Sequence, residues 1–341
     1  MTRTKSASAT IHDVARLAGV SVATVSRYIN HTAPVSAEVA ARLEQVMAQI
    51  QYSPLATARS LATHKTNTVG LLLNVITGDF FAPLLSGIEA ATRESGYELL
   101  ISSTRHPDRR RGAPAPLGPH NTDGLLVFAD SLDAEGLEHF YSKKFPMVLI
   151  HRSPPAHLSI PCVTVENKAA SCHIVEHLIL VHNRQRIVFL RGSQGQEDSD
   201  WREQGYRRAL SNHNLLYDPA LVLPGGFDRY IAHLAIQTLL SAGIGFDAVF
   251  AGDDEAAVGV MAALHEAGKA IPAEVAVVGF DDQRMSPYLA PPLTTVRAPT
   301  EEVGKVAVEQ LVSLIRTGQA EPLSLLPTEI VIRQSCGCEP S

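Results

Sequence analysis

Hydrophobic positions in the first fifty residues recur three or four residues apart, in three short stretches that each follow a serine or threonine. The stretches are Ile11, Val14, Ala15 and Ala18; then Val22, Val25 and Ile29; then Val39, Leu43, Val46, Met47 and Ile50. This spacing places each set on one face of a helix, and Thr10, Ser21 and Ser36 suit the N-cap positions. Gly19 suits a left-handed exit from the first helix. We therefore predict three helices around a shared core.

The second predicted helix carries short or polar side chains away from its apolar face, namely Ala23, Thr24, Ser26 and Arg27. With the glycine turn before it, this arrangement is typical of a helix-turn-helix, which places its second helix in the major groove of DNA. The same spacing also occurs in ordinary small helical bundles, so the pattern by itself leaves both interpretations open.

The distribution of charge favours DNA binding. Residues 1–66 contain seven Lys and Arg against three Asp and Glu, a net charge of +4, whereas the whole 341-residue chain has a net charge of −6. The remainder of the chain therefore carries −10. A basic end favours contact with phosphates, and the acidic remainder disfavours general adhesion to nucleic acid.

From residue 68 onward, short β-branched and apolar runs alternate with helical patterns. The predicted strands cover residues 69–75, 98–102, 124–128, 147–150, 163–165, 187–190, 221–223, 248–250 and 275–280. The predicted helices cover residues 81–94, 168–181, 201–212, 230–242, 255–267 and 300–317. This α/β alternation predicts two doubly wound lobes with parallel sheets. Ligands of such sheets bind at the carboxyl ends of the strands, so we expect a site in the cleft between the lobes.

Residues 53–61 connect the helical end to the α/β part. Ser53 and Pro54 suit the cap and the first position of a short helix, which would carry Ala58 and Leu61 at compatible spacing. A nine-residue helix is too short to be stable alone in water, so it needs a partner helix or DNA. A disordered linker is the alternative interpretation.

The composition indicates a water-soluble chain of two or three compact domains. Hydrophobic residues make up 45% of the sequence, but no long uncharged apolar run occurs, and residues 1–8 are polar and basic, unlike a signal peptide. Four cysteines are too few for a disulfide framework and suit a reducing cytoplasm. Cys336 and Cys338 form one close pair without a second pair of ligands, so we predict an ordinary tail there, with no metal and no cofactor.

The stretch DVARLAGVSVATVSRYIN, residues 13–30, resembles the headpiece of the LacI/GalR family of bacterial transcription regulators nearly residue for residue. The resemblance implies a cytoplasmic repressor that binds a pseudo-palindromic operator as a homodimer. In that family the second helix reads the major groove, and the segment matching ARSL, residues 58–61, pairs with its twofold mate and inserts a leucine into the minor groove.

The DNA-binding residues that this resemblance implies are Thr10, Ser21, Val22, Ala23, Thr24, Ser26, Arg27, Asn30, Ala58 and Leu61. Val22 and Ala23 occupy the positions that discriminate operator bases. Both side chains are small and apolar, so they offer contact with thymine methyl groups but no hydrogen bonds. The operator sequence therefore stays open.

The remainder resembles the regulatory core of the same family, which is itself similar to periplasmic sugar-binding proteins. The matching segments are FFAPLLSGIEAA, VLIHR, DWREQGYRRAL, FAGDDEAAVG, VAVVGFDD, PPLTTVRAP and LLPTEIVIRQSC. The chain is then expected to cross between lobes near Glu166, Thr294 and Leu323.

These resemblances divide the chain into four parts. They are a flexible basic tail (1–9), a helix-turn-helix domain (10–52), a hinge helix or linker (53–66) and an effector-binding and dimerisation core (67–341). Within the core, lobe 1 takes about 67–165 and 295–322, and lobe 2 takes about 166–294 and 323–341.

The family's ligand positions, carried over to matching residues, are Phe80, Phe81, Arg202, Phe227, Asp253 and Asp281. Aromatic rings stack on a sugar or base, the guanidinium group donates a planar fork, and carboxylates accept hydrogen bonds from hydroxyls. The mixture suits a sugar, a sugar derivative or a small anion. Gln196 and Asp198 contribute polar contacts in some relatives only.

The sequence departs from the family pattern at several positions. His151 stands where an acid is usual before arginine, and Glu166 replaces the usual aspartate before Asn167. Residues 105–124, rich in proline and glycine, occupy the place of an expected helix that they cannot sustain. We expect an irregular, mobile loop there, and the departures leave the effector open.

Three other functions are weighed. The core of the same regulator could respond to a protein co-regulator rather than to a small molecule. An exported solute-binding protein is contradicted by the basic start and the helical end. A zinc-dependent enzyme is the third, because His173, Glu176 and His177 match the H-x-x-E-H pattern, but no third ligand is evident. Residues 192–195 lack the lysine of a phosphate-binding loop, so we predict no catalysis.

Overall fold

The computed structural model describes residues 9–30, 33–52, 65–104 and 115–339. The chain divides into two compact units, residues 1–67 and 68–341, and each is described by itself. Within the described ranges, no helix is both long and apolar enough to cross a membrane. Residues 53–64, with Ala58 and Leu61, lie outside these ranges, as do most of the predicted tail and residues 105–114.

The first unit consists of three helices, as predicted, namely α1 (Ile11–Ala18), α2 (Val22–Asn30) and α3 (Ala37–Gln49). Thr10 caps α1 in a reciprocal capping box with Asp13, and Gly19 ends the helix with φ +66°. The hydroxyl of Ser21 accepts a hydrogen bond from the amide of Thr24 and so begins α2. Val14, Val25 and Leu43, one from each helix, are fully buried where the helices meet.

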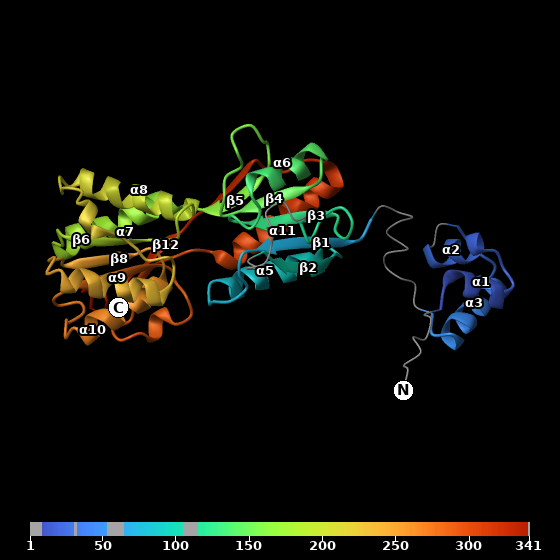
Figure 1. Ribbon diagram of the computed structural model, residues 1–341, viewed down its shortest axis with the longest axis horizontal. Coiled ribbons are helices and arrows are strands. Elements are labelled where there is room, and N and C mark those ends of the chain that lie inside the picture. The colour runs from blue at the N-terminus through green and yellow to red at the C-terminus, as the bar shows by residue number, and fades with distance from the viewer. Residues whose placement is uncertain (1–8, 31–32, 53–64, 105–114, 340–341) are drawn as a thin grey trace. The chain divides into compact units, whose positions relative to one another are not determined.

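The second unit contains two six-stranded sheets, each with helices on both faces (Figure 1). The first sheet has the order β11-β5-β4-β3-β1-β2, and all its neighbouring strands are parallel. Its strands are β1 (Thr68–Leu73), β2 (Glu98–Ser103), β3 (Gly124–Phe128), β4 (Met147–Ile150), β5 (Cys162–Val165) and β11 (Leu323–Leu326). We call this sheet and its helices α5 (Phe81–Glu94), α6 (Ala134–Ser142) and α11 (Thr300–Thr317) the first lobe.

The second lobe is built on the sheet β12-β10-β9-β8-β6-β7, parallel except for the pairing of β10 with β12. Its strands are β6 (Ile187–Arg191), β7 (Val222–Pro224), β8 (Ala248–Ala251), β9 (Ala276–Asp281), β10 (Thr294–Arg297) and β12 (Glu329–Val331). Its helices are α7 (Asn167–His182), α8 (Glu197–Asn212), α9 (Arg229–Ser241) and α10 (Asp254–Glu266). The two-lobed α/β prediction is therefore confirmed.

Alternating strand residues pack into different cores on the two faces of each sheet, and one of these cores is continuous between the two sheets. In β8, Ala248 and Phe250 join the cluster that also contains residues of α7 and α8, whereas Val249 and Ala251 join residues of α9 and α10. Because every second side chain of a strand points to the same face, a strand buried on both sides must be apolar throughout. This is why these short runs were recognisable in the sequence.

The lobe boundaries near the C-terminus differ from those predicted. Residues 294–297 form β10, which pairs with β9 of the second lobe rather than belonging to the first. Residues 323–326 form β11, which pairs with β5 of the first lobe rather than belonging to the second. The crossings therefore lie near Glu166, at Ala298 to Pro299 and at Pro327 to Thr328. Helix α6 and strands β10, β11 and β12 were not predicted; the three strands contain polar residues and so lack a continuous apolar run.

Helices α5 and α11 of the first lobe approach each other through glycines. A methyl group added at Gly87 would lie 1.9 Å from the carbonyl oxygen of Glu301, and one added at Gly304 would lie 2.4 Å from that of Leu84. The obstructing atoms are backbone atoms of the facing helix, so rotation of a side chain cannot relieve either clash.

We predict that Gly87→Ala lowers the free energy of unfolding by about 2 kcal/mol or more, because it forces the two helices apart. Urea unfolding of the full chain, followed by circular dichroism, measures the effect. Gly245→Ala is the matched control: no atom lies within 4 Å of the added methyl group, so the change should stay below about 0.5 kcal/mol. Equal effects of the two substitutions would contradict this prediction.

Candidate effector-binding site

A cavity of about 580 Å³ lies between the two lobes, and we call it the interlobe cleft. Its walls are the segments that follow the carboxyl ends of strands in both sheets. Asn74 follows β1, Ala129 follows β3 and His151 follows β4 in the first lobe, while Asp253 follows β8 and Phe227 comes soon after β7 in the second. The cavity therefore lies where the doubly wound topology predicts a ligand site.

The first lobe contributes an aromatic wall to the cleft. The ring of Phe80 lies 5.3 Å from that of Phe81, 6.0 Å from that of Phe128 and 5.8 Å from the imidazole of His151, measured between centroids. Phe80 and Phe81 begin α5, so the helix fixes their positions. Such a wall offers an apolar face on which the flat side of a ring can stack.

Arg202 of α8 is the most extensively bound side chain of the opposite wall and is only 3% exposed. Its Nε donates to Asn167 Oδ1 over 2.9 Å, and its other nitrogens donate to the carbonyl oxygen of Gly252 and, over 3.4 Å, to Asp281 Oδ1. The guanidinium carbon lies 3.7 Å from the centroid of the Phe280 ring. Three hydrogen bonds and an aromatic face stabilise this buried charge.

Phe227 also lies near this guanidinium group, with its ring centroid 5.4 Å from the guanidinium carbon. Its backbone has φ +54°, and its ring packs over two glycines. Any side chain at Gly192 would meet the ring at 2.5 Å, and one at Gly252 would meet it at 3.0 Å. The two glycines therefore make room for the Phe227 ring at the cleft.

Three buried carboxyl groups lie together in the second lobe, those of Asp253, Asp254 and Asp281. Burial raises the pKa of Asp253 well above its ordinary value, and the nearby Asp281 raises it further. Burial also raises the pKa of Asp281, which Arg202 only partly offsets. Asp253 also caps α10 by accepting a hydrogen bond from the amide of Ala256 over 2.8 Å.

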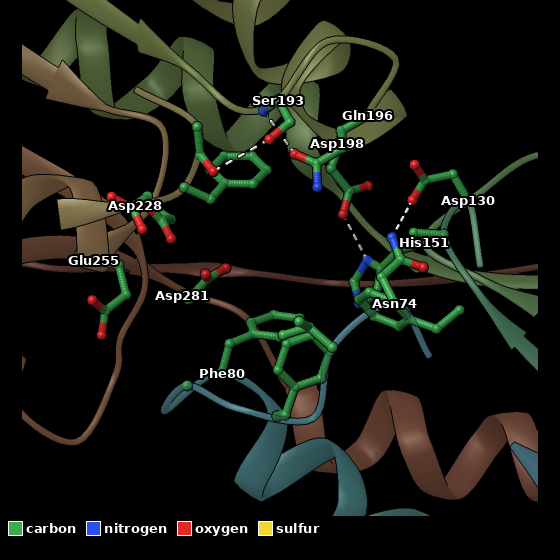
Figure 2. A pocket seen from close by; sticks show the side chains of 18 of the residues that line it. Asn74, Phe80, Asp130, His151, Ser193, Gln196, Asp198, Asp228, Glu255 and Asp281 are labelled. Atoms are coloured by element: carbon green, nitrogen blue, oxygen red, sulfur yellow. Dashed lines mark hydrogen bonds and ion pairs between the residues drawn. The ribbon is translucent and has the colours of Figure 1, made fainter. Parts of the chain in front are cut away.

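Polar contacts of Asp198 and Glu197 join the lobes across the cleft. Nδ1 of His151 lies 2.8 Å from Asp198 Oδ2, and the amide of Ser153 donates to Glu197 Oε2 over 2.6 Å. Burial raises the pKa of Asp198, but His151, Arg202 and a hydrogen bond from Asn167 outweigh burial, so the net pKa is below its ordinary value. Figure 2 shows the His151 and Asp198 side chains facing each other from the two lobes.

Several buried polar atoms of the cleft have no hydrogen-bond partner among the described residues. They are Nε2 of His151, the side-chain amide atoms Nε2 and Oε1 of Gln283, and Oδ1 of Asn74. The Nδ2 of Asn74 donates a hydrogen bond to Asp130. Leaving such atoms unpaired costs free energy unless a ligand or water satisfies them. These groups are therefore the candidates for binding a ligand's polar atoms.

All six predicted effector residues, together with Gln196 and Asp198, line the interlobe cleft. Sequence reasoning did not select Asn74, Asp130, Gln283 or Glu197. His151 was noticed only as a departure from the family pattern. His151 comes directly after the predicted strand 147–150, a signal that could have identified it, whereas Asn74 lies within the predicted strand 69–75 because β1 ends earlier, at Leu73.

Helix α2, which is predicted to contact DNA, exposes small, polar and basic side chains. Ala23, Arg27 and Ser21 are exposed, and Thr24 and Ser26 are half-buried. The hydroxyl groups of Ser21 and Thr24 lie 2.9 Å apart. Val22 is half-buried against the core of the three helices, so part of its side chain serves the fold. Asn30 ends α2.

The H-x-x-E-H pattern does not form a joint site. His173 is exposed, and Glu176 accepts a hydrogen bond from Asn212 Nδ2 over 2.9 Å. His177 instead lies near the C-terminal cysteines, with Cys338 Sγ 3.6 Å from its Nε2. The three residues thus do not gather around one position, which contradicts the zinc-dependent enzyme considered above.

Asp254 anchors the loop that presents Asp281 and Gln283 to the cleft. Its carboxylate accepts hydrogen bonds from the amide of Gln283 over 2.8 Å, from Thr295 Oγ1 over 2.6 Å and from Ser286 Oγ. Burial raises the pKa of Asp254 from 3.8 to about 7 despite these hydrogen bonds.

Comparison with known proteins gives a consistent assignment. Residues 10–54 match the model for "Bacterial regulatory proteins, lacI family", and residues 175–336 match that for a periplasmic binding protein-like domain. The ribose operon repressor of Escherichia coli (strain K12) is 32% identical over 323 residues, covering 94% of this chain and 97% of that protein. The regulator GalR of the same strain is 34% identical over 307 residues, covering 90% of this chain and 89% of GalR.

Among solved structures, a complex of the transcriptional regulator CelR with cellobiose superposes with a TM-score of 0.70 at 26% identity. The match covers 96% of this chain and 99% of that one.

We predict that removing the Asp254 carboxyl group makes stability less dependent on pH. The folded chain binds the Asp254 proton more tightly than the unfolded chain, so this group's contribution is complete below pH 3.8 and is lost as pH rises to about 7. The free energy of unfolding of the wild type relative to Asp254→Asn should therefore fall over this range, by at most about 1.4 kcal/mol per pH unit.

Urea unfolding at a series of pH values measures this difference. Asp79→Asn is the control, because it also removes one carboxyl group, but an exposed one. A wild-type minus Asp254→Asn difference that stays constant, or that rises with pH, would show the prediction to be wrong.

Proposed function

The chain belongs to the lacI family of bacterial regulatory proteins and is a DNA-binding transcriptional regulator, not an enzyme; from this premise we propose that it is a cytoplasmic repressor controlled by a neutral sugar. The sugar is proposed to bind in the interlobe cleft. The three-helix unit is proposed to bind an operator as part of a homodimer, with residues 53–66 as the hinge and residues 67–341 as the effector-binding and dimerisation core.

The chemistry of the interlobe cleft supports a neutral, polyhydroxylated ligand. Among the residues that the structure describes, eight carboxyl groups and two arginines, Arg152 and Arg202, line the cleft. Arg152 donates to the carbonyl oxygens of Ala129 and Leu132, and Arg202 is bound as described above. A phosphate or carboxylate would meet this excess of negative charge, whereas hydroxyl groups can donate to the carboxylates.

The aromatic wall and the amide and imidazole atoms without a hydrogen-bond partner also support a sugar ligand. The Phe80 ring can stack on the apolar face of a sugar ring. His151, Gln283 and Asn74 supply polar atoms that need partners. The names of two similar proteins, the ribose operon repressor and the cellobiose complex of CelR, include a sugar. The effector-binding residues proposed here are Phe80, Phe81, Arg202, Phe227, Asp253 and Asp281.

The DNA-binding residues are proposed from α2 and the hinge. They are Thr10, Ser21, Val22, Ala23, Thr24, Ser26, Arg27 and Asn30, with Ala58 and Leu61 in the hinge. Arg27 is an exposed cation on the polar face of α2, where a phosphate contact is sterically open. This part of the proposal rests on the family resemblance and on the exposed surface of α2.

Calorimetric titration of the full chain tests the effector. Ribose, other pentoses, hexoses and cellobiose form one arm of the panel, and inorganic phosphate, sugar phosphates and nucleobases form the other. We expect one neutral sugar to bind with one site per chain. Binding of anionic compounds alone would contradict a neutral effector, and no binding by any member would favour control by a protein partner.

Asp281→Asn is expected to weaken binding of that sugar by roughly 10-fold to 150-fold, because a hydrogen bond to a charged group contributes about 1.5–3 kcal/mol. Glu135→Gln, an exposed carboxyl group of α6 outside the cleft, is the matched control and should leave affinity unchanged. If Asp281→Asn binds the sugar as tightly as the wild type, Asp281 is not a ligand contact.

Selection of bound fragments from genomic DNA identifies the operator, and Arg27→Ala then tests the interface. The substitution should weaken binding to all DNA sequences to a similar extent. It should also make the slope of log affinity against log salt concentration shallower by about one for each Arg27 side chain that is removed. Arg42→Ala is the matched control, because Arg42 lies on α3 in an ion pair with Glu38. Equal losses for the two variants would exclude the specific role of Arg27.

A further inference from the structure

Four metal-ligating side chains meet in the second lobe, far along the sequence from one another and outside the interlobe cleft. His177 and His182 lie on the C-terminal part of α7, and Cys336 and Cys338 follow β12 near the end of the chain. One potential ligand atom from each residue lies within 4.8 Å of all the others. In the described parts of the chain, no other group of His, Cys, Asp and Glu satisfies this test.

The distances within this cluster approach those of a tetrahedral site. Cys338 Sγ lies 3.4 Å from His182 Nε2 and 3.6 Å from His177 Nε2. A zinc ion bound at about 2.3 Å from sulfur and about 2.0 Å from nitrogen separates two such ligands by roughly 3.5 Å. The two imidazole rings lie 5.0 Å apart between centroids at an angle of 74°, so neither blocks the other.

The backbone around the cysteines is shaped to bring them to α7. Gly337 has φ +114°, and a methyl group added there would lie 3.0 Å from Nδ1 of His182. A side chain at this position would therefore press on the imidazole and strain the backbone. Gly337 lets the Cys336 to Cys338 turn approach the histidines closely.

The core of the second lobe holds this turn in place. Cys336 is fully buried, and Thr294 Oγ1 lies 3.1 Å from its sulfur. Ser335 Oγ accepts from the amide of Thr294 over 2.8 Å and donates to the carbonyl oxygen of Val277 over 2.6 Å. The cysteines are thus positioned by β9 and β10 before any ligand arrives.

The donor set also identifies the ion that fits. Two thiolates and two imidazoles are the ligands of structural zinc sites, and four protein ligands leave no open position for catalysis. Two thiolates neutralise one Zn²⁺, so the loaded site carries no net charge. Its partial burial therefore costs little free energy. Loading converts two thiols to thiolates and releases two protons, while the histidines bind as neutral imidazoles.

We propose that His177, His182, Cys336 and Cys338 bind one zinc ion, which ties the C-terminal segment to α7. The segment that the ion fixes continues directly from β12 and packs on β10. Zinc therefore stabilises the edge of the second lobe without entering the effector cleft.

The test uses the full chain, reduced, freed of metal and without a histidine tag. Titration with Co²⁺ should give the visible absorption of a tetrahedral, thiolate-ligated ion at one equivalent per chain. Zn²⁺ should then displace the cobalt, release two protons per chain at a pH where the free thiols are protonated, and raise the thermal unfolding temperature. Zinc should also protect Cys338 from alkylation, which peptide mass spectrometry detects.

Cys338→Ser and His177→Gln should each weaken metal binding by more than the roughly 10–100-fold that loss of an outer-shell partner causes. His173→Gln is the matched control, since His173 is exposed on the same helix and outside the cluster. Cys338→His keeps four donors and should retain tetrahedral binding.

Circular dichroism of each variant separates loss of metal from loss of fold, and Cys338 is suited to substitution because it is only half-buried. Three results would overturn the proposal. They are no cobalt uptake by the reduced wild type, uptake that survives both Cys338→Ser and His177→Gln in folded protein, and equal loss in His173→Gln.

Discussion

The interlobe cleft depends on one buried positive charge. The guanidinium group of Arg202 lies against the ring of Phe280. It reaches the N-terminal end of α7 through Asn167, the end of β8 through Gly252 and the end of β9 through Asp281. These three segments form one wall of the cleft. A charge so deeply buried must be fully paired, and its pairing fixes where Asp281 and the ends of the strands lie.

The same need for pairing of buried groups explains how several acidic side chains can lie close together near Arg202. Asp253, Asp254 and Asp281 would repel one another if all were ionised, and burial raises the pKa of each. Asp254 is nevertheless surrounded by hydroxyl and amide donors, and Asp281 has Arg202. The wall is therefore organised by hydrogen bonding to carboxyl groups rather than by simple ion pairing, which suits recognition of hydroxyl groups.

Much of this architecture could be predicted from the sequence, for physical reasons that also define the limits. Strands such as β3 and β8 are buried on both faces, so their continuous apolar runs identified them. Strands β11 and β12 are partly exposed and include polar residues, so no continuous apolar run marked them, and the lobe boundaries were misplaced.

Among the site residues, Arg202 and Asp281 came from the resemblance, whereas Gln283 did not. Gln283 lies at the cleft because its backbone amide donates a hydrogen bond to the Asp254 carboxylate. This is a tertiary contact that no local sequence pattern encodes. The four residues of the proposed zinc site are another case. The close cysteine pair was visible, but the paired histidines lie more than 150 positions away, and only the fold of the second lobe brings them together.

The connections between the lobes determine how they can move. Two of the three are hydrogen-bonded to each other: the amide of Glu166 donates to the carbonyl oxygen of Leu326, and Thr328 Oγ1 donates to that of Glu166. A rotation of the lobes about these two coupled strands would preserve both hydrogen bonds, whereas sliding would break them. Such a rotation would change the separation of His151 and Asp198, whose contact joins the lobes across the cleft.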